Sequence, residues 1–336
     1  QRCEDLDPAK PACDAAGACR ACTKNDECAS GVCVKAGDCA QVPPVSGLGV
    51  GRCVPASQVA KVTPATIEAA LAGATPYLLL AAGSYSALSI TRPVALVGPG
   101  REGDASTTAV LEQVSVSTTG AVSLSDLQVA SSTKPTGVSC RGDADLCVVR
   151  ARVDVSGDLA IAVDASSACS SITVAQTWMR SVGGVALAAG TLLVAPKKVQ
   201  YRIVDDVVVQ SGTATTPTPV ILGKTAEGTF AFNTLFNNRG SVSCALSQVL
   251  QESIFAAAGG GQAPAGCTAG ADVIVDLDVG TDIKAGANGV PTLDPTTAKV
   301  MSDVLDKATP LAPPLAVDYA GKPRGATPDR GALESP

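Results

Sequence analysis

Hydrophobic residues in the central part of the chain recur in one short pattern. Beyond Gly120, apolar side chains stand at offsets 0, 2, 5 and 7, in copies that start near residues 122, 148, 172, 201, 230 and 249. Offsets 0 and 2 place two side chains on one face of a strand, the next two residues make a corner, and offsets 5 and 7 line a second strand. The copies start 26, 24, 29, 29 and 19 residues apart, which is typical of one coil of a parallel β-helix.

Stacked coils pair the backbone groups that a single coil leaves unpaired, and small aliphatic side chains fill their narrow interior. A β-sandwich also has short alternating strands, but it does not explain a corner that recurs at one offset. We therefore predict that a set of repeat residues points into the solenoid: Leu124, Leu127, Val174, Phe232, Leu235 and Ile254.

The segment before the repeat predicts a capping helix and three short strands. Thr63 is a typical N-cap and Pro64 a typical first helical residue, while Ile67 and Leu71 share one helix face. Apolar runs of strand length follow, bounded by turn residues, at 78–82, 88–90 and 94–97. We expect an all-β protein in which residues 58–284 form a right-handed parallel β-helix with a short helix as its N-terminal cap.

Composition agrees with a core of small aliphatic residues and excludes several partners. Hydrophobic residues make up 46% of the 336 residues, but aromatic residues only 3% and charged residues 17%. The net charge is -6 and no window is rich in Lys and Arg, so we expect no nucleic-acid partner. No apolar run approaches the roughly 20 residues that a bilayer crossing needs, so we expect no membrane span.

The first 53 residues differ from the rest in cysteine content. This segment has almost no aliphatic run and cannot close a hydrophobic core, so covalent staples must order it. We predict a disulfide-rich module over residues 1–57. The alternative is zinc, because CRAC at 19–22 has metal-ligand spacing, but the segment lacks histidine and a second matching motif. The predicted disulfide cysteines here are Cys3, Cys13, Cys19, Cys22, Cys28, Cys33, Cys39 and Cys53.

Five further cysteines lie in the predicted β-helix. Cys140 and Cys147 bracket a polar loop, and Cys244 and Cys267 bracket a Gly-rich excursion, so we expect two local disulfides. Cys169 is then left over as a buried free thiol. Disulfides indicate an oxidising compartment, and we interpret the polar start of the chain as the end left by signal-peptide removal. We expect a secreted protein, extracellular or on the cell surface.

Three stretches resemble known bacterial sequences. The run TIEAALAGATPYLLLAAGSYSALSITRPVALVGPG, residues 66–100, resembles the opening of pectate-lyase-like right-handed β-helix proteins. The tail DYAGKPRGATPDRGALE, residues 318–334, is similar to the closing motif of extracellular choice-of-anchor Q proteins. The head, with CDAAGACRACTKNDECASGVC, resembles short modules of secreted myxobacterial proteins. These resemblances imply a bacterial β-helix protein and specify fold better than activity.

The pectate-lyase-like resemblance implies two catalytic patterns, and the chain departs from both. Lyases of this fold use clustered aspartates with calcium and an Arg base, and hydrolases use paired acids with a His. The chain has no histidine, and Asp205 and Asp206, as neighbours on a strand, point to opposite faces. The best acidic cluster lies late in the chain, at Asp272, Asp276, Asp278 and Asp282. We expect these acids to share the solvent face of one strand. They form either a solvated acidic face or a calcium site.

Two other features are candidates for binding. The loop at 140–147 holds an Arg-Gly-Asp triplet, which is typical of adhesive ligands and equally of ordinary turns. The residue after the third repeat position should face outward, and in four coils it is apolar. Either this stripe is covered by the Pro-rich tail, residues 285–336, or it meets another molecule or a sugar. Its predicted members are Trp178, Val208 or its neighbour Val207, Phe236 and Phe255.

The missing catalytic groups favour a noncatalytic function. We expect a structural or adhesive β-helix protein that assembles into a filament or matrix, with itself, another surface protein or a polysaccharide as its partner. We expect no cofactor apart from the calcium alternative. The alternative functions are a polysaccharide lyase or hydrolase, by fold analogy, and a carbohydrate-binding module that uses Trp178 and the Phe residues.

Overall fold

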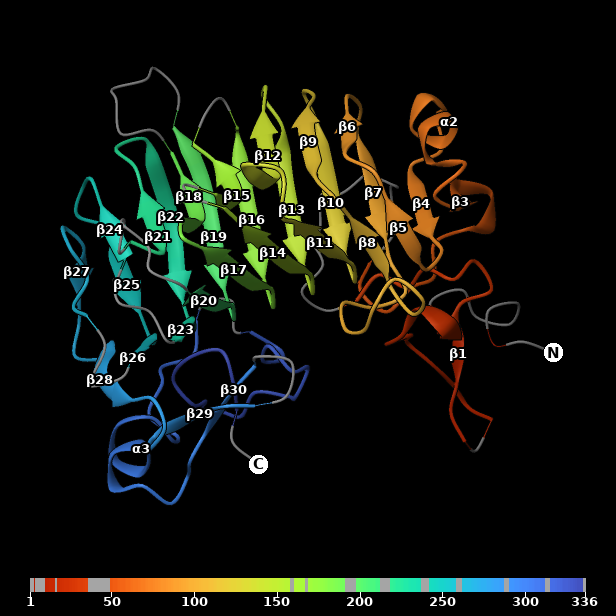
Figure 1. The fold of residues 1–336 in the computed structure, drawn as a ribbon. Coiled ribbons are helices and arrows are strands. Elements are labelled where there is room, and N and C mark those ends of the chain that lie inside the picture. The colour runs from red at the N-terminus through yellow and green to blue at the C-terminus, as the bar shows by residue number, and fades with distance from the viewer. Residues whose placement is uncertain are drawn as a thin grey trace.

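The computed structural model describes residues 3, 10–15, 17–35, 49–157, 160–166, 169–190, 198–211, 218–236, 242–257, 262–286, 290–311 and 315–334. Within them the chain is a parallel β-solenoid, as the repeat predicts, with strands stacked side by side along one axis (Figure 1). Every strand pair within its three long sheets is parallel, and each sheet collects one strand from each successive coil. No helix in the described part is long and apolar enough to cross a membrane.

The three sheets differ in length because coils begin and end at different corners. The ten-stranded sheet consists of β3 (Val59–Val62), β4 (Tyr77–Leu80), β7 (Val94–Val97), β10 (Ala121–Ser125), β13 (Asp145–Val149), β16 (Ser171–Ala175), β19 (Val199–Val204), β22 (Ala226–Ala231), β25 (Val249–Gln251) and β27 (Thr268–Ala269). The nine-stranded sheet consists of β5 (Gly83–Tyr85), β8 (Ala109–Leu111), β11 (Gln128–Ser131), β14 (Arg152–Ser156), β17 (Trp178–Val182), β20 (Val207–Ser211), β23 (Thr234–Phe236), β26 (Ile254–Ala257) and β28 (Ile274–Asp278). The seven-stranded sheet consists of β6 (Leu88–Ile90), β9 (Val114–Ser117), β12 (Thr136–Arg141), β15 (Ile161–Ala165), β18 (Val185–Ala189), β21 (Val220–Leu222) and β24 (Val242–Cys244).

The interior is a continuous stack of small aliphatic side chains. Alternation along each strand sends every second residue inward, and parallel pairing aligns these residues from coil to coil. Of the six residues predicted to point inward, four belong to this core: Leu124, Leu127, Val174 and Leu235.

Two of the six inward predictions are wrong. The register aligns Phe230, and not Phe232, with Val174 and Leu124. Phe232 instead occupies the corner with a positive φ of 57° and is buried on the outside. Ile254 pairs with Thr234 and also faces outward. The 0, 2, 5, 7 template lies two residues too late in the copy at 230 and one residue too late in the copy at 249, because Phe230 and Leu250 occupy its second inward position.

A short helix closes the N-terminal end of the core. Helix α2 (Ile67–Ala72) buries Ile67 and Leu71 in the main cluster. It begins three residues after the predicted start, because Thr63 to Thr66 form a turn in which the Thr66 hydroxyl accepts a hydrogen bond from the Thr63 amide at 2.9 Å. The predicted cap is therefore present in a shortened form.

The head packs against the first coils of the ten-stranded sheet. It contains the hairpin β1 (Ala12–Cys13) and β2 (Cys19–Arg20) and the single turns η1 (Asn25–Glu27) and η2 (Ala56–Gln58). Its disulfides join Cys3 to Cys13, Cys22 to Cys33 and Cys28 to Cys53, while Cys19 lies in β2 and Cys39 lies outside the described residues. Val32 and Val54 contact the outward side chains of Tyr77, Ala95 and Val97.

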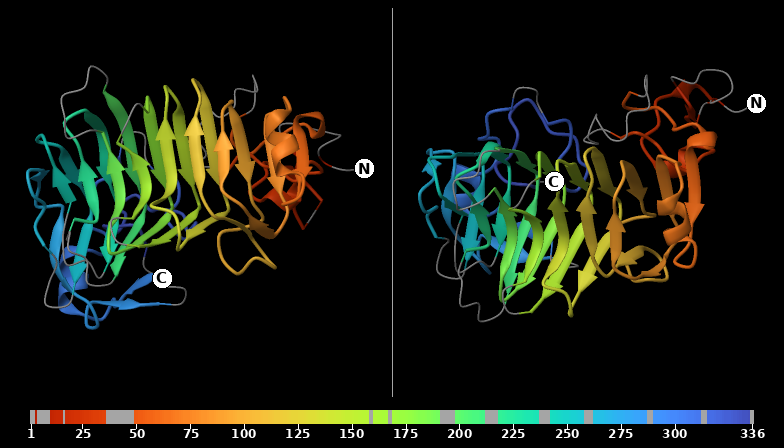
Figure 2. Two further views of the ribbon diagram at one scale, coloured as in Figure 1. Left: turned by 45° about the horizontal axis from the view of Figure 1, so that its top comes forward. Right: turned by 90° about the horizontal axis from the view of Figure 1, so that it is seen from above.

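The tail follows the last coil. It consists of the antiparallel pair β29 (Ile283–Ala285) and β30 (Pro291–Leu293), the helix α3 (Ala298–Asp303) and an extended segment to residue 334. It contacts the nine-stranded sheet and, through Ala308, Leu311 and Leu315, the middle of the ten-stranded sheet. Figure 2 shows the head and the tail on the same side of the solenoid, near its two ends.

The disulfides of the solenoid differ in part from the prediction. Cys244 and Cys267 are joined, but Cys140 is joined to Cys169 and not to Cys147. Cys140 and Cys169 both point into the core, whereas Cys147 alternates with Leu146 on β13 and faces outward. The short sequence separation of Cys140 and Cys147 was therefore misleading, and Cys169 is not a free thiol.

Candidate functional site

The outer face of the nine-stranded sheet carries the tryptophan of the chain. Trp178 begins β17 and is only 2% exposed. The guanidinium carbon of Arg152 lies 3.9 Å from the centre of its ring, and that of Arg180 lies 5.4 Å away. Asp154 accepts two hydrogen bonds from Arg180, at 2.8 and 2.7 Å. Trp178 therefore faces outward as expected, but it is a buried residue between cations.

Phe255 points inward, and so does Val208, whereas the alternative Val207 faces outward beside Trp178. Val208 pairs with Met179, and Phe255 pairs with Leu235, in the core. The prediction was one residue out of register in these two coils, and a shift by one residue exchanges the faces of a strand. The observed outer stripe consists of Trp178, Val207, Val209, Phe236, Ile254 and Ala256.

The tail covers the outer stripe. Leu293 of β30, Val300 and Val304 near α3, and Tyr319 and Ala332 of the extended segment form one buried cluster with it. Figure 1 shows this part of the chain, in blue, beside the edge formed by β17, β20 and β23. The stripe is thus a contact within the chain and offers no open surface where the tail lies.

Arg324 of the closing motif attaches the tail to the solenoid at the corner after β19. Arg324 forms a buried ion pair with Asp205 at the corner after β19 and a second with Glu334 at 2.5 Å. It also donates hydrogen bonds to the backbone oxygens of Asp329 at 3.1 Å and Gly331 at 2.9 Å. Its guanidinium carbon lies 4.4 Å from the centre of the Phe232 ring. Arg324 therefore connects both parts of the chain through charge, hydrogen bonds and ring contact.

A second attachment lies at Glu252, two coils beyond Asp205. Arg330 donates to the Glu252 carboxylate at 3.1 Å and to the backbone oxygen of Asp303 at 2.8 Å. The amide of Gly331 donates to the Glu252 backbone oxygen at 2.8 Å. A Cβ at Gly331 would lie 2.6 Å from the end of the Ile254 side chain, and the φ of 84° favours glycine at this position.

A third attachment uses the loop after β7. Arg101 donates to the Tyr319 backbone oxygen at 2.8 Å and stacks on its ring at 3.9 Å, and it also binds the backbone oxygen of Gln176. The Gln176 side chain in turn donates to the Asp318 backbone oxygen at 2.8 Å. The tail thus attaches to several successive coils.

The hydrophobic repeat did not indicate these attachment residues. The signal that could have found those on the solenoid is the residue two positions after the second inward residue of each repeat, a corner with positive φ that is polar in five of six coils. Asp126, Arg150, Gln176, Asp205, Phe232 and Glu252 occupy this corner column.

The neighbouring acids Asp205 and Asp206 face different surroundings. Asp205 points to Arg324, and burial raises its pKa to about 7 although the guanidinium opposes the shift. Asp206 points into the corner, where its Oδ1 accepts a hydrogen bond from the Thr177 amide at 2.8 Å. Burial, reinforced by the Asp205 carboxylate, raises the pKa of Asp206 well above its usual value. The two carboxyl groups therefore do not act as one acid pair on a shared ligand.

Asp206 belongs to a ladder of polar side chains inside the corner. The amide of Asp206 donates to Asn233 Oδ1 at 3.0 Å, and the amide of Asn233 donates to Ser253 Oγ at 3.2 Å. Asn233 also donates to the Ile203 backbone oxygen at 2.9 Å. The ladder satisfies backbone groups that the tight corner leaves unpaired, so it is structural.

The late acidic residues do not converge. Only Asp276 and Asp278 lie on β28; Asp272 and Asp282 lie outside it, so the expectation of one shared strand face is wrong. Asp276 is paired with Lys299, and Asp272 accepts a hydrogen bond from the Glu252 amide at 3.2 Å. Among the described residues, the one group of three or more metal-type ligands within 4.8 Å of one another is a cysteine cluster elsewhere.

The Arg-Gly-Asp loop forms a tight turn between β12 and β13. Gly142 has a φ of 72°, and Arg141 and Asp143 are exposed. The Ser170 hydroxyl donates to the Asp143 backbone oxygen at 3.0 Å. Because Cys140 pairs with Cys169, the predicted Cys140–Cys147 disulfide does not close this loop.

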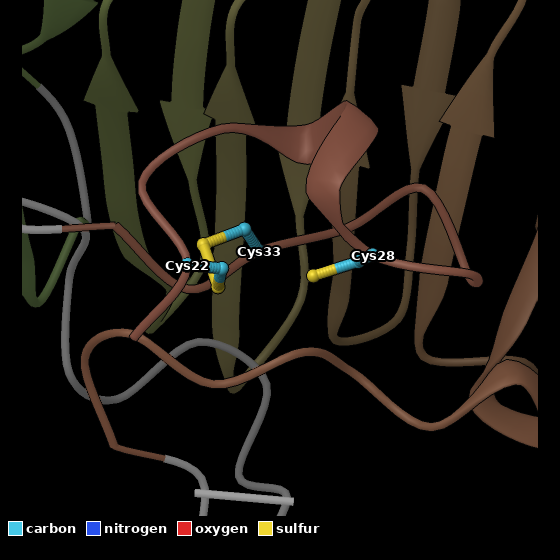
Figure 3. Close-up of side chains that lie close together, drawn as sticks. All are labelled: Cys22, Cys28 and Cys33. Atoms are coloured by element: carbon cyan, nitrogen blue, oxygen red, sulfur yellow. A yellow bond between two sulfur atoms is a disulfide. The ribbon is translucent and has the colours of Figure 1, made fainter. Parts of the chain in front are cut away.

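The cysteine cluster lies in the head. Cys22, Cys28 and Cys33 are buried, and their sulfur atoms lie within 4.8 Å of one another. Figure 3 shows the bonded pair Cys22 and Cys33 with the sulfur of Cys28 beside it. Cys28 is in turn bonded to Cys53. Two disulfides thus pack side by side.

A cavity of about 460 Å³ opens where the tail crosses the ten-stranded sheet. Polar side chains line the solenoid side and the tail contributes Pro310 and Leu311. The lining residues of the solenoid are Arg202, Thr229, Gln251, Glu252 and Asp272.

The fold and these contacts define a parallel β-helix protein with a disulfide-stapled head and a docked tail. Comparisons with protein-family models, with curated proteins and with solved structures found no match to this chain.

Proposed function

We propose that the protein is a noncatalytic, secreted structural or adhesive protein in which the solenoid serves as a rigid rod. The main support for this proposal is that the buried charged groups at the corners bind the tail. Asp205, Glu252, Arg324 and Arg330 hold the tail in place, so these groups are engaged in structure. An acid or base in catalysis needs a proton-transfer partner within reach in a substrate cleft.

The seven-stranded sheet supplies the surface for assembly. In the described residues, the clusters that hold the head and the tail use outward side chains of the other two sheets. Most outward residues of the seven-stranded sheet are small or aliphatic, and Asp164 adds one charge. They include Ser115, Ser139, Asp164, Ala188 and Ile221 in one row, and Thr136, Ile161 and Val185 in the next. A contact between copies through this face produces a fibre if it does not close into a ring.

The test combines size and activity. Purified protein is measured by light scattering over a range of concentrations, and separately incubated with uronic-acid polymers and calcium. We expect concentration-dependent large particles and no new polymer ends. Ile161→Arg should weaken assembly, because it places a charge at the centre of the face, whereas Val249→Arg, an exposed residue on another sheet, should not. A monomer at all concentrations would overturn self-assembly, and polymer turnover would overturn the noncatalytic function.

A second candidate function is carbohydrate binding in the cavity at the tail. Its hydroxyl, amide and charged groups beside Pro310 and Leu311 are the mixture that sugar ligands use. Calorimetric titration with oligosaccharides tests it. Binding that Arg202→Ala abolishes, with assembly unchanged, would favour this function.

A further inference from the structure

The cavity where the tail crosses the ten-stranded sheet contains one uncompensated charge of each sign. Three charged side chains line it, those of Arg202, Glu252 and Asp272. The Glu252 carboxylate is compensated, because it pairs with Arg330 at 3.1 Å and accepts a hydrogen bond from the Thr309 amide at 2.8 Å. Among the described residues, no ion pair includes Arg202 or Asp272. The cavity therefore offers one cation and one anion to a ligand.

The surroundings of Arg202 and Asp272 leave both charges available. The Arg202 charge favours the ionised form of Asp205, but the Asp205 carboxylate is bound by Arg324. Asp272 accepts a hydrogen bond from the Glu252 amide at 3.2 Å, and this neutral donor does not balance the charge of a carboxylate. Both residues are half-buried in the wall of an open cavity, so a ligand can reach them.

The cation and the anion belong to different coils. Strand β19, which carries Arg202, pairs with β22, and β22 pairs with β25. The Asp272 carboxylate binds the amide of Glu252, the residue that follows β25. Two coil steps, roughly 10 Å, therefore separate this carboxylate from the Arg202 backbone. A ligand that carries two opposite charges some distance apart fits this arrangement better than a ligand with a single charge.

The rest of the cavity wall combines neutral polar groups with an apolar surface. Thr229 and Gln251 contribute a hydroxyl and an amide from the solenoid, and Thr309 contributes a hydroxyl from the tail. Pro310 and Leu311 form the apolar part. Sugar hydroxyls can bind the polar groups while the CH groups of the ring pack on the apolar part. The volume of about 460 Å³ lies in the range of small-molecule sites.

We propose that this cavity binds a zwitterionic oligosaccharide, with its carboxylate at Arg202 and its ammonium group at Asp272. The proposal rests on the second candidate function, sugar binding in this cavity, and names the class of sugar. A guanidinium presents parallel N–H donors that match the two oxygens of a carboxylate, and a carboxylate accepts hydrogen bonds from an ammonium group. A neutral sugar leaves both protein charges unpaired, and a sugar with a carboxylate alone leaves Asp272 unpaired.

The test is calorimetric titration of the full-length protein with four disaccharides. Glucuronic acid joined to glucosamine carries both charges, and its N-acetylated form carries the carboxylate alone. The glucosamine dimer carries amines alone, and lactose carries no charge. We expect the zwitterionic disaccharide to bind about tenfold more tightly than each of the other three, because each of them lacks at least one charged hydrogen bond.

Two variants assign the charges to their partners. Asp272→Asn should bind the zwitterionic disaccharide and its N-acetylated form with equal affinity, because the ammonium group has lost its partner. Arg202→Gln should bind the zwitterionic disaccharide no more tightly than the glucosamine dimer. Lys224→Gln and Asp26→Asn are controls at exposed residues outside the cavity, and both should keep the wild-type order of affinities.

The possible failures are distinguishable. Equal affinity for lactose and the zwitterionic disaccharide would overturn this proposal and leave the second candidate function standing. Absence of binding by all four disaccharides would overturn both. A preference for the zwitterion that survives in both Asp272→Asn and Arg202→Gln would place the sugar elsewhere and overturn the proposal. Circular dichroism checks that the variants are folded, and if one is not, the wild-type order of the four affinities decides.

Discussion

The head and the tail pack on the outside of the same solenoid, but different interactions stabilise them. The buried cluster of the head is Ala12 with disulfide cysteines, and its contact with the solenoid rests mainly on Val32 and Val54. The tail joins a large apolar cluster and adds ion pairs through Arg324 and Arg330. Cysteines are thus used where a segment has little apolar surface of its own.

This difference shows how the chain orders segments that cannot fold alone. The head lacks the aliphatic residues for a core, so cross-links restrict its unfolded state. The tail has enough apolar residues to cover the outer stripe, and its buried charges fix where it docks. Removing one partner of such a buried pair is costly, because the other charge is left without compensation. We therefore expect the two segments to respond to different perturbations.

The largest effect should come from the solenoid that supports both segments. Leu235→Asp places a charge in the core, where Leu235 is fully buried, and should destabilise by about 5 kcal/mol or more. Because neighbouring coils stabilise each other, several coils should unfold together. Urea unfolding followed by circular dichroism measures this loss. Ser115→Asp on the outer face is the control, and an equal loss there would contradict the assigned faces.

Arg324→Ala should release the tail and leave the head in place. The change leaves Asp205 buried without its partner, and such losses are about 3–5 kcal/mol. Limited proteolysis should cut residues 290–334 first. Lys322→Ala, an exposed change in the same segment, should alter stability by less than about 0.5 kcal/mol. A tail that stays protected in Arg324→Ala would show that apolar contacts alone hold it.

Asp206→Asn should stabilise the protein, and the gain should depend on pH. Burial raises the pKa of Asp206 in the folded state, while the unfolded carboxyl ionises above about pH 4. The wild-type free energy of unfolding should therefore fall as pH rises, by about 1.4 kcal/mol per pH unit. Asn keeps the acceptor for the Thr177 amide and does not ionise.

The measurement is urea unfolding of wild type and Asp206→Asn between pH 3 and pH 7. The two curves should meet near pH 3 and diverge above pH 4. Asp164→Asn on the outer face of β15 is the matched control and should show little divergence. Curves that stay parallel would mean that Asp206 is ionised in the folded protein.

The smallest effect should come from the ion pair between the head and the corner column. Lys35 Nζ lies 2.9 Å from Asp126, which also binds Arg150 at 3.0 Å. Burial opposes ionisation of Asp126, but the two cations hold its pKa below the usual value. Lys35→Ala should weaken head docking by about 1 kcal/mol, and docking should weaken in acid as Asp126 takes up a proton. Hydrogen exchange of residues 22–35 measures this, with Lys24→Ala as the control.

The sequence predicted the solenoid well because its signal is local and repeated. Residues such as Leu124 and Leu127 alternate along short strands, and each coil repeats the pattern. The frame failed at Phe232 and Ile254, because apolar residues beside the true inward positions fit the template one or two residues too late. Alternation of apolar residues fixes a face only while the register is known.

The attachments of the head and the tail could not be predicted in the same way. Arg324 and Asp205 are 119 residues apart, and Arg330 and Glu252 are 78 apart. Such pairs depend on where the tail crosses the corner column, which no local pattern encodes. Disulfide pairing is difficult to predict for the same reason, because Cys140 is bonded to Cys169 and not to Cys147, which is nearer in the sequence.

The central claim is that cross-links order the head while stacked aliphatic layers order the solenoid. Hydrogen exchange with mass spectrometry, on oxidised and phosphine-reduced protein in metal-free buffer, tests it most directly. Reduction should raise exchange in residues 10–35 and 49–58, because the closed loops of the head each contribute about 3 kcal/mol. Strands β4 to β26 and the tail should keep their protection. Loss of protection across the coils, or an unchanged head, would contradict the account.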